Sequence, residues 1–101
     1  MVSIDRPGAA PCVEISPKQD VEFDFRETPL RDIVRWISCA RSLNLMFKTS
    51  EVANRKITWV SSRKVKGHSL KRRFVAMLRS EGLRLRSTGP YLVIEARALD
   101  R

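Results

Sequence analysis

Residues 21–43, VEFDFRETPLRDIVRWISCARSL, join a strand pattern to a helix pattern without a break. In the first five residues apolar and acidic side chains alternate, which is typical of a half-buried strand. Thr28 suits the N-cap of a following helix, and Pro29 suits its first position. The helix has a core stripe at i, i+3, i+4 and i+7 and a second, partly apolar face, so we expect it to pack between two layers; the stripe is Leu30, Ile33, Val34 and Ile37, and the second face is Trp36, Cys39, Ala40 and Leu43.

The rest of the chain continues with short strands and one more helix. NLMFKT (44–49) predicts a short buried strand, SEVANR (50–55) a loop, and KITWVSS (56–62) a strand with Ile57 and Trp59 on one face. After the connection RKVKGH (63–68), a second helix is predicted over 69–81, with Gly82 as its C′ residue. Its core stripe is Leu70, Phe74, Met77 and Leu78. LRLRS (83–87) and YLVIEA (91–96) predict two strands joined by the turn TGP (88–90).

The predicted order is therefore β-α-β-β-α-β-β, with a faint internal repeat at an offset of forty residues. Leu30, Val34, Ile37, Leu43 and Leu45 correspond to Leu70, Phe74, Met77, Leu83 and Leu85. We expect an α+β fold in which two helices pack between a two-stranded and a three-stranded sheet. Residues 1–20 hold three of the five prolines and are interpreted as an extended lead-in, with at most a short strand at CVEI (12–15). The domain proper would span 21–97, and 98–101 would form a tail.

Composition favours one compact domain with an acidic partner. The chain has 101 residues, of which 43% are hydrophobic, and a formal net charge of +9. Such a charge favours nucleic acid, anionic lipid or an acidic protein surface as a partner. No run of apolar residues is long enough to span a membrane, and the first residues show no export signal. A single histidine, His68, and two cysteines argue against a metal site or a His-based catalytic group, so we expect no cofactor and no enzymatic activity.

The ordered set of motifs resembles the N-terminal periplasmic domain of secretins, the outer-membrane channels of type II secretion and related machines. The resemblance covers about residues 20–97. It rests on a strand ending in Phe, a helix that opens Leu30-Arg31-Asp32-Ile33, a central strand, a helix ending in the Gly82-Leu83 step, and two final strands. Many secretins carry an Asp-Pro-x-Val-x-Gly segment where this chain has KTSEVANRK (48–56), so we expect a turn of a different shape there.

The resemblance implies a docking module in the periplasmic part of an outer-membrane protein. Its partners would be the inner-membrane platform protein of a secretion system and neighbouring secretin subunits in a ring. Nucleic acid would not be a partner, and only the rest of the parent chain would contact a membrane. In this family the small sheet meets the platform, and here that sheet would be formed by the strands at 21–26 and 56–61. An edge strand suits such contacts because its backbone groups are unpaired. The implied partner-binding residues are Glu22, Phe23, Asp24, Phe25, Arg26, Thr58, Trp59, Val60 and Ser61.

Two features leave alternatives open. The basic cluster, which comprises Arg63, Lys64, Lys66, Lys71, Arg72 and Arg73, is either a solvated surface or a site for an acidic partner. Three of its members lie in the first turn of a helix, where positive charge is unfavourable. Cys12 and Cys39 are compatible with two thiols or one disulfide, and a periplasmic location favours the disulfide.

Two other functions compete with the docking module. The periplasmic signalling domain of a TonB-dependent transducer shares its layout. A small basic nucleic-acid-binding domain fits the charge, although the chain has no GxxG loop, RNP-type strand, zinc spacing or helix-turn-helix order.

Overall fold

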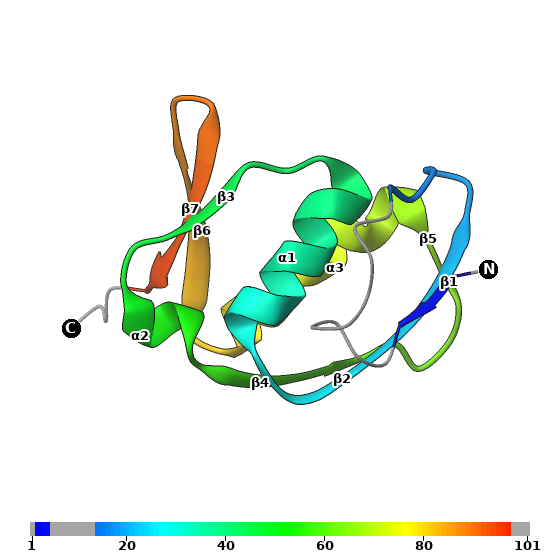
Figure 1. The fold of residues 1–101 in the computed structure, drawn as a ribbon, viewed down its shortest axis with the longest axis horizontal. Coiled ribbons are helices and arrows are strands. Elements are labelled where there is room, and N and C mark those ends of the chain that lie inside the picture. The colour runs from blue at the N-terminus through cyan, green and yellow to red at the C-terminus, as the bar shows by residue number, and fades with distance from the viewer. Residues whose placement is uncertain (1, 5–13, 98–101) are drawn as a thin grey trace.

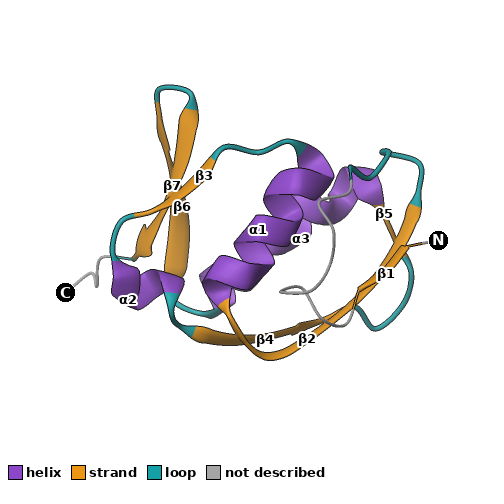
Figure 2. Cartoon of the chain, viewed as in Figure 1, coloured by secondary structure: helices purple, strands orange, loops and turns teal. Residues whose placement is uncertain are grey.

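The computed structural model describes residues 2–4 and 14–97, which form an α+β fold. The two long helices lie beside two separate sheets, as Figure 1 shows, and Figure 2 gives the same view coloured by secondary structure. The elements are β1 Val2–Ile4, β2 Asp20–Pro29, α1 Leu30–Arg41, β3 Leu45–Phe47, α2 Ser50–Ala53, β4 Lys56–Val60, β5 Val65–Lys66, a 3₁₀ turn Gly67–Ser69, α3 Leu70–Ser80, β6 Leu83–Thr88 and β7 Tyr91–Ala96.

The first sheet is built around β2. β1 pairs with it in parallel, whereas β4 and β5 pair with it antiparallel. Val21 is paired with both Val2 and Val65, so β1 and β5 lie on opposite sides of β2. The strand order β1-β2-β4 places β4 on the same side as β5. The expectation of a two-stranded sheet was therefore wrong in strand number, although the two strands it named do pair with each other.

The second sheet has three strands in the order β3-β7-β6. β3 runs parallel to β7, and β6 and β7 form an antiparallel hairpin in which Thr88 pairs with Tyr91. The turn between them is therefore Gly89-Pro90, and Gly89 takes a positive φ of 57°. The prediction of a three-stranded sheet is confirmed.

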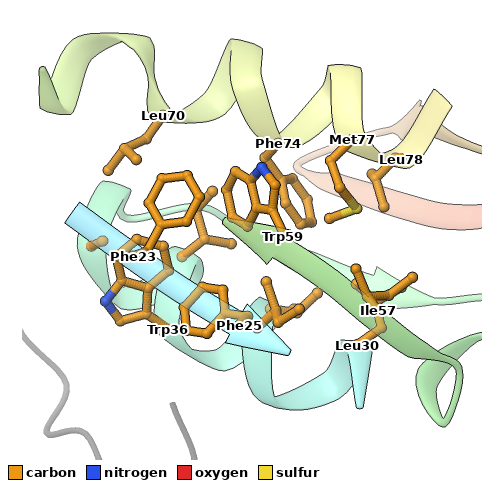
Figure 3. Close-up of a cluster of buried hydrophobic side chains, with 14 of the residues drawn as sticks. Phe23, Phe25, Leu30, Trp36, Ile57, Trp59, Leu70, Phe74, Met77 and Leu78 are labelled. Atoms are coloured by element: carbon orange, nitrogen blue, oxygen red, sulfur yellow. The ribbon is translucent and has the colours of Figure 1, made fainter. Parts of the chain in front are cut away.

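The core lies where the two helices meet the first sheet. Its centre is an aromatic cluster comprising Phe23, Phe25, Trp36, Trp59 and Phe74. The ring centroids of Phe23 and Trp59 are 4.2 Å apart, and those of Phe25 and Trp36 are 5.2 Å apart. Figure 3 shows α3 contributing Leu70, Phe74, Met77 and Leu78 to the same region. Both predicted helix stripes are buried, and both tryptophans belong to the core.

The start of α1 differs from the prediction. β2 continues to Pro29, which pairs with Lys56, so Thr28 is a strand residue and not an N-cap. Its hydroxyl donates a hydrogen bond to the carbonyl oxygen of Arg26. The strand extends this far because a bulge at Glu27, with a φ of +48°, shifts the register and keeps β2 paired with β4.

Several short elements also differ. SEVANR contains the helix α2, whose N-cap Thr49 accepts a hydrogen bond from the backbone N–H of Val52. The connection RKVKGH contains β5 and the 3₁₀ turn. β3 is not buried as predicted, because Met46 is 48% exposed. Of the strand considered at CVEI, residues 12 and 13 lie outside the described part, and residues 14 and 15 are not in a strand.

The two helices end in the same way, forty residues apart. α1 is capped by Ser42 and α3 is followed by Gly82, and both residues take left-handed backbone angles, with φ of 53° and 74°. The prediction that Gly82 is the C′ residue is confirmed. Each end turns the chain into a strand of the second sheet, as the internal repeat predicts.

Candidate docking surface

The two strands predicted to dock a partner form one antiparallel pair. Asp24 pairs with Val60 and Phe25 with Trp59, and the register shifts by one residue at the bulge before Thr28 pairs with Ile57. At its start, β2 is paired on both edges, with β1 on one and β5 on the other. β4 has β2 on one side only, and among the described strands nothing pairs with its other side.

The predicted partner-binding residues divide between the core and the surface. The side chains of Phe23, Phe25 and Trp59 point into the aromatic cluster (Figure 3), so a partner could reach these residues only through their backbone. Arg26, Thr58 and Val60 are exposed. Val60, at 40% exposure, is one of the few large apolar side chains on the surface of the described part of the chain. Those with intermediate exposure are Glu22, Asp24 and Ser61.

Side-chain hydrogen bonds fix the outer face of this sheet. The guanidinium of Arg26 contacts the carboxylate of Asp24 at 2.7 Å. The backbone N–H of Glu27, in the bulge, donates to the hydroxyl of Thr58 at 3.1 Å. The hydroxyl of Ser61 accepts a hydrogen bond from the backbone N–H of Phe23 at 3.0 Å. These bonds satisfy groups that the bulge and the end of β4 would otherwise leave unpaired.

The outer edge of β4 presents backbone groups with which no described strand pairs. The N–H of Ser61 donates to the carbonyl of Phe23, and the carbonyl of Arg55 accepts from the N–H of Leu30. Odd-numbered residues of this segment therefore direct their backbone groups toward β2, and by the alternation of an antiparallel ladder the even-numbered ones direct theirs outward. The outward-facing residues are Lys56, Thr58 and Val60.

A groove of about 370 Å³ runs along this edge, between β4 and α3. α3 lies beside β4 where the ring of Phe74 packs against Trp59, with a centroid distance of 5.8 Å (Figure 3). The groove is lined from β4 by Thr58, Trp59 and Val60 and from α3 by Arg73, Ala76, Met77 and Ser80. Of the α3 residues, only Arg73 was predicted as a site residue, because the sequence carries no signal for which helix flanks which strand edge.

The basic cluster is divided by the fold. Lys66 lies in β5 and forms an ion pair with Asp20 at 2.7 Å, and its hydrogen bond lowers the pKa of that carboxyl. Arg63 and Lys64 follow the end of β4, and Lys71, Arg72 and Arg73 open α3. These five side chains are exposed, and none of them forms an ion pair within the described part of the chain. Lys66 therefore has a local structural role that the other five lack.

The predicted disulfide stays a prediction. Cys12 lies outside the described residues, and Cys39 lies near the end of α1 with intermediate exposure. The N–H of Ile15 donates to the carbonyl of Ala40 at 2.9 Å, and Arg41 donates to the carbonyl of Ile15. The chain thus crosses the end of α1 three residues after Cys12.

A second charged group lies on the outer face of the other sheet. Glu95 is buried and accepts hydrogen bonds from Arg84 at 2.6 Å and from Arg86 at 2.8 Å. Hydrogen bonds from Arg86 and Arg84 lower the pKa of Glu95 to about 2. Because all three residues satisfy one another on adjacent strands, they stabilise the β6–β7 pair.

This ion-pair group predicts a pH dependence of stability. The pKa of Glu95 is lower in the folded protein than its ordinary value of 4.5, so its contribution is fully present above pH 4.5 and is lost as pH falls toward about 2. We expect Glu95→Gln to lower the melting temperature at pH 6, and the difference from wild type to shrink as pH falls toward 2. Thermal melts from pH 6 to 2 measure it, with Glu14→Gln, an exposed carboxylate, as the control. A difference that is independent of pH would contradict the assignment.

Within residues 2–4 and 14–97, no group of three or more His, Cys, Asp or Glu side chains is placed to hold a metal ion. None of the helices in this part combines the length and apolar character that crossing a membrane requires. The site is thus an exposed sheet edge beside a basic helix, which defines the chain as an α+β domain with a candidate docking surface. No protein-family model matches the sequence, and no curated protein matches it.

Proposed function

We propose that this chain is a non-enzymatic protein-docking domain of the kind found at the N-terminus of secretins, and that it couples an outer-membrane channel to the inner-membrane platform of a secretion system. The observation that carries the proposal is the pairing of β2 with β4 in one sheet whose outer β4 edge is paired with no described strand. A sheet of this kind can accept a partner along its edge or on its face.

The layout of the described residues supports the same proposal. The chain has two long helices and two sheets, in keeping with the layout that the resemblance to secretins implies. The signalling domain of a TonB-dependent transducer shares this layout. The parent gene distinguishes the two, because further small α/β repeats would follow residue 101 in a secretin, whereas a plug and a barrel would follow in a transducer.

The binding test uses the purified chain and the periplasmic region of the platform protein encoded in the same gene cluster. We expect saturable binding by calorimetry, and we expect Val60→Asp to weaken it about fivefold or more, because the change places a charge in an apolar contact. Tyr91→Asp is the matched control, since Tyr91 is 46% exposed on the other sheet. Absence of binding, or equal weakening by both variants, would contradict the proposed docking surface.

A further inference from the structure

The groove between β4 and α3 offers a strand edge to an extended chain. The backbone groups of Lys56, Thr58 and Val60 face away from β2, and no described strand pairs with them. A strand added to an edge lies about 4.8 Å from its neighbour, so it would run along the groove that separates β4 from α3. The small side chain of Ala76 in the wall of the groove leaves room for the side chains of such a strand.

The charge around the groove identifies the chemistry of the occupant. Arg73 lines it, whereas Lys71 and Arg72, in the same helical turn, line a separate pocket with His68 and Arg79. α3 runs antiparallel to β4, so this turn lies near the end of β4 that leads into Arg63 and Lys64 (Figure 3). Within the described residues none of these five cations forms an ion pair, although Lys64 helps to lower the pKa of Asp20, and the first turn of α3 contains no acidic residue. Carboxylates on the occupant would be attracted to these cations.

A second copy of the chain is a poorer occupant than an acidic peptide. The formal net charge of +9 makes two copies repel each other. Lys56 also places a charged side chain at the start of β4, a common device against pairing between identical edges. Both observations favour a partner of opposite charge.

We propose that this groove binds an extended acidic segment of a partner protein, which pairs with β4 as an additional strand. Successive side chains of an added strand point to opposite faces, so every second one would face α3. Of these, one would be a carboxylate beside Arg73, and the next would be small or apolar beside Ala76. This inference rests on the proposed docking function and specifies the chemistry of the partner at that site.

The test uses four blocked six-residue peptides and the ¹⁵N-labelled chain. The first has the sequence Glu-Thr-Val-Thr-Glu-Thr, so that Glu and Val alternate on one face of the strand. The second has Lys in place of Glu, and the third and fourth are the Glu peptide N-methylated on one or the other set of alternate backbone amides. We expect neither the Lys peptide nor the peptide with N-methyl groups facing β4 to bind, in contrast to the first peptide. Its binding would shift the amide signals of Lys56, Thr58 and Val60 and would slow their hydrogen exchange, because these amides gain backbone partners.

Arg73→Glu tests the charge, and Arg35→Glu is its matched control. Both side chains are exposed on a long helix and lack ion pairs in the described part, but only Arg73 lines the groove. We expect Arg73→Glu to weaken binding of the Glu peptide about tenfold and Arg35→Glu to weaken it by less than about twofold. Equal effects of the two variants, binding of the Lys peptide as tight as that of the Glu peptide, or amide shifts outside β4 and α3 would overturn the inference.

Other occupants give different results. Dimerisation in sedimentation experiments that Thr58→Pro abolishes would assign the edge to a second copy. Displacement of the Glu peptide by a single-stranded oligonucleotide at physiological salt, with shifts at the same amides, would assign the groove to nucleic acid. Either result would overturn the inference. If the platform protein binds but Arg73→Glu has no effect, the docking function stands without the acidic segment; if the Glu peptide binds and the platform protein does not, the docking function fails.

Discussion

Replacing Phe25 with alanine is expected to lower the free energy of unfolding by about 3–5 kcal/mol, the usual cost of removing a buried phenylalanine. Phe25 is 0% exposed, and its ring contacts Phe23, Trp36 and Trp59 at centroid distances between 5.2 and 6.0 Å. The cavity would lie between β2 and α1, where the sheet is attached to the rest of the core. A loss of this size is a large part of the stability of a typical domain.

Urea denaturation followed by tryptophan fluorescence measures the effect, because both tryptophans belong to the aromatic cluster. Tyr91→Ala removes an aromatic ring of similar size from an exposed position and should cost less than about 1 kcal/mol. Phe25→Leu keeps most of the volume and should fall between the two. A cost for Phe25→Ala equal to that of Tyr91→Ala would show that β2 does not pack against the helices as described.

The second large effect is expected at Gly67. A Cβ atom at this position would lie 2.2 Å from the carbonyl oxygen of Ser16, which is too close for any side chain. The N–H of Gly67 donates to the carbonyl of Gln19, and the N–H of His68 donates to the carbonyl of Pro17. Gly67→Ala must therefore push residues 15–19 away from the 3₁₀ turn, and we expect a cost of about 1–3 kcal/mol.

Hydrogen exchange distinguishes this local effect from a loss of global stability. In Gly67→Ala, the amides of residue 67 and His68 should exchange much faster than in the wild type. The amide of Leu92 donates to the carbonyl of Asn44, beside the second sheet, and its exchange should change only as much as the lower global stability requires. Unchanged exchange at residues 67 and 68 would mean that the close approach to Ser16 is absent in solution.

Most of the fold could be predicted because its larger elements have clear periodicity. The alternation in VEFDF and the stripe beginning at Leu30 predicted β2 and α1, and YLVIEA coincides with β7. The elements that were missed have two to four residues: β1, α2 and β5. Segments this short have little periodicity of their own, and β1 and β5 exist because β2 offers both of its sides to them.

The candidate site was only partly predictable for a related reason. Sequence patterns located the strands around Phe23 and Thr58, but the direction of the backbone groups depends on register, and the register depends on the bulge at Glu27. A bulge with a glutamate at positive φ has no sequence signature comparable to that of a glycine turn. The groove depends in addition on where α3 packs, which is a tertiary property.

The β6–β7 hairpin, which projects past the helices and away from the first sheet (Figure 1), has a practical use in binding experiments. Its tip, Gly89-Pro90, is exposed, and exposed loop tips tolerate insertions well. A short affinity tag inserted between these two residues would anchor the protein to a sensor surface by the sheet opposite the docking strands. Every immobilised molecule would then hold the β4 edge toward the solution, in a single orientation.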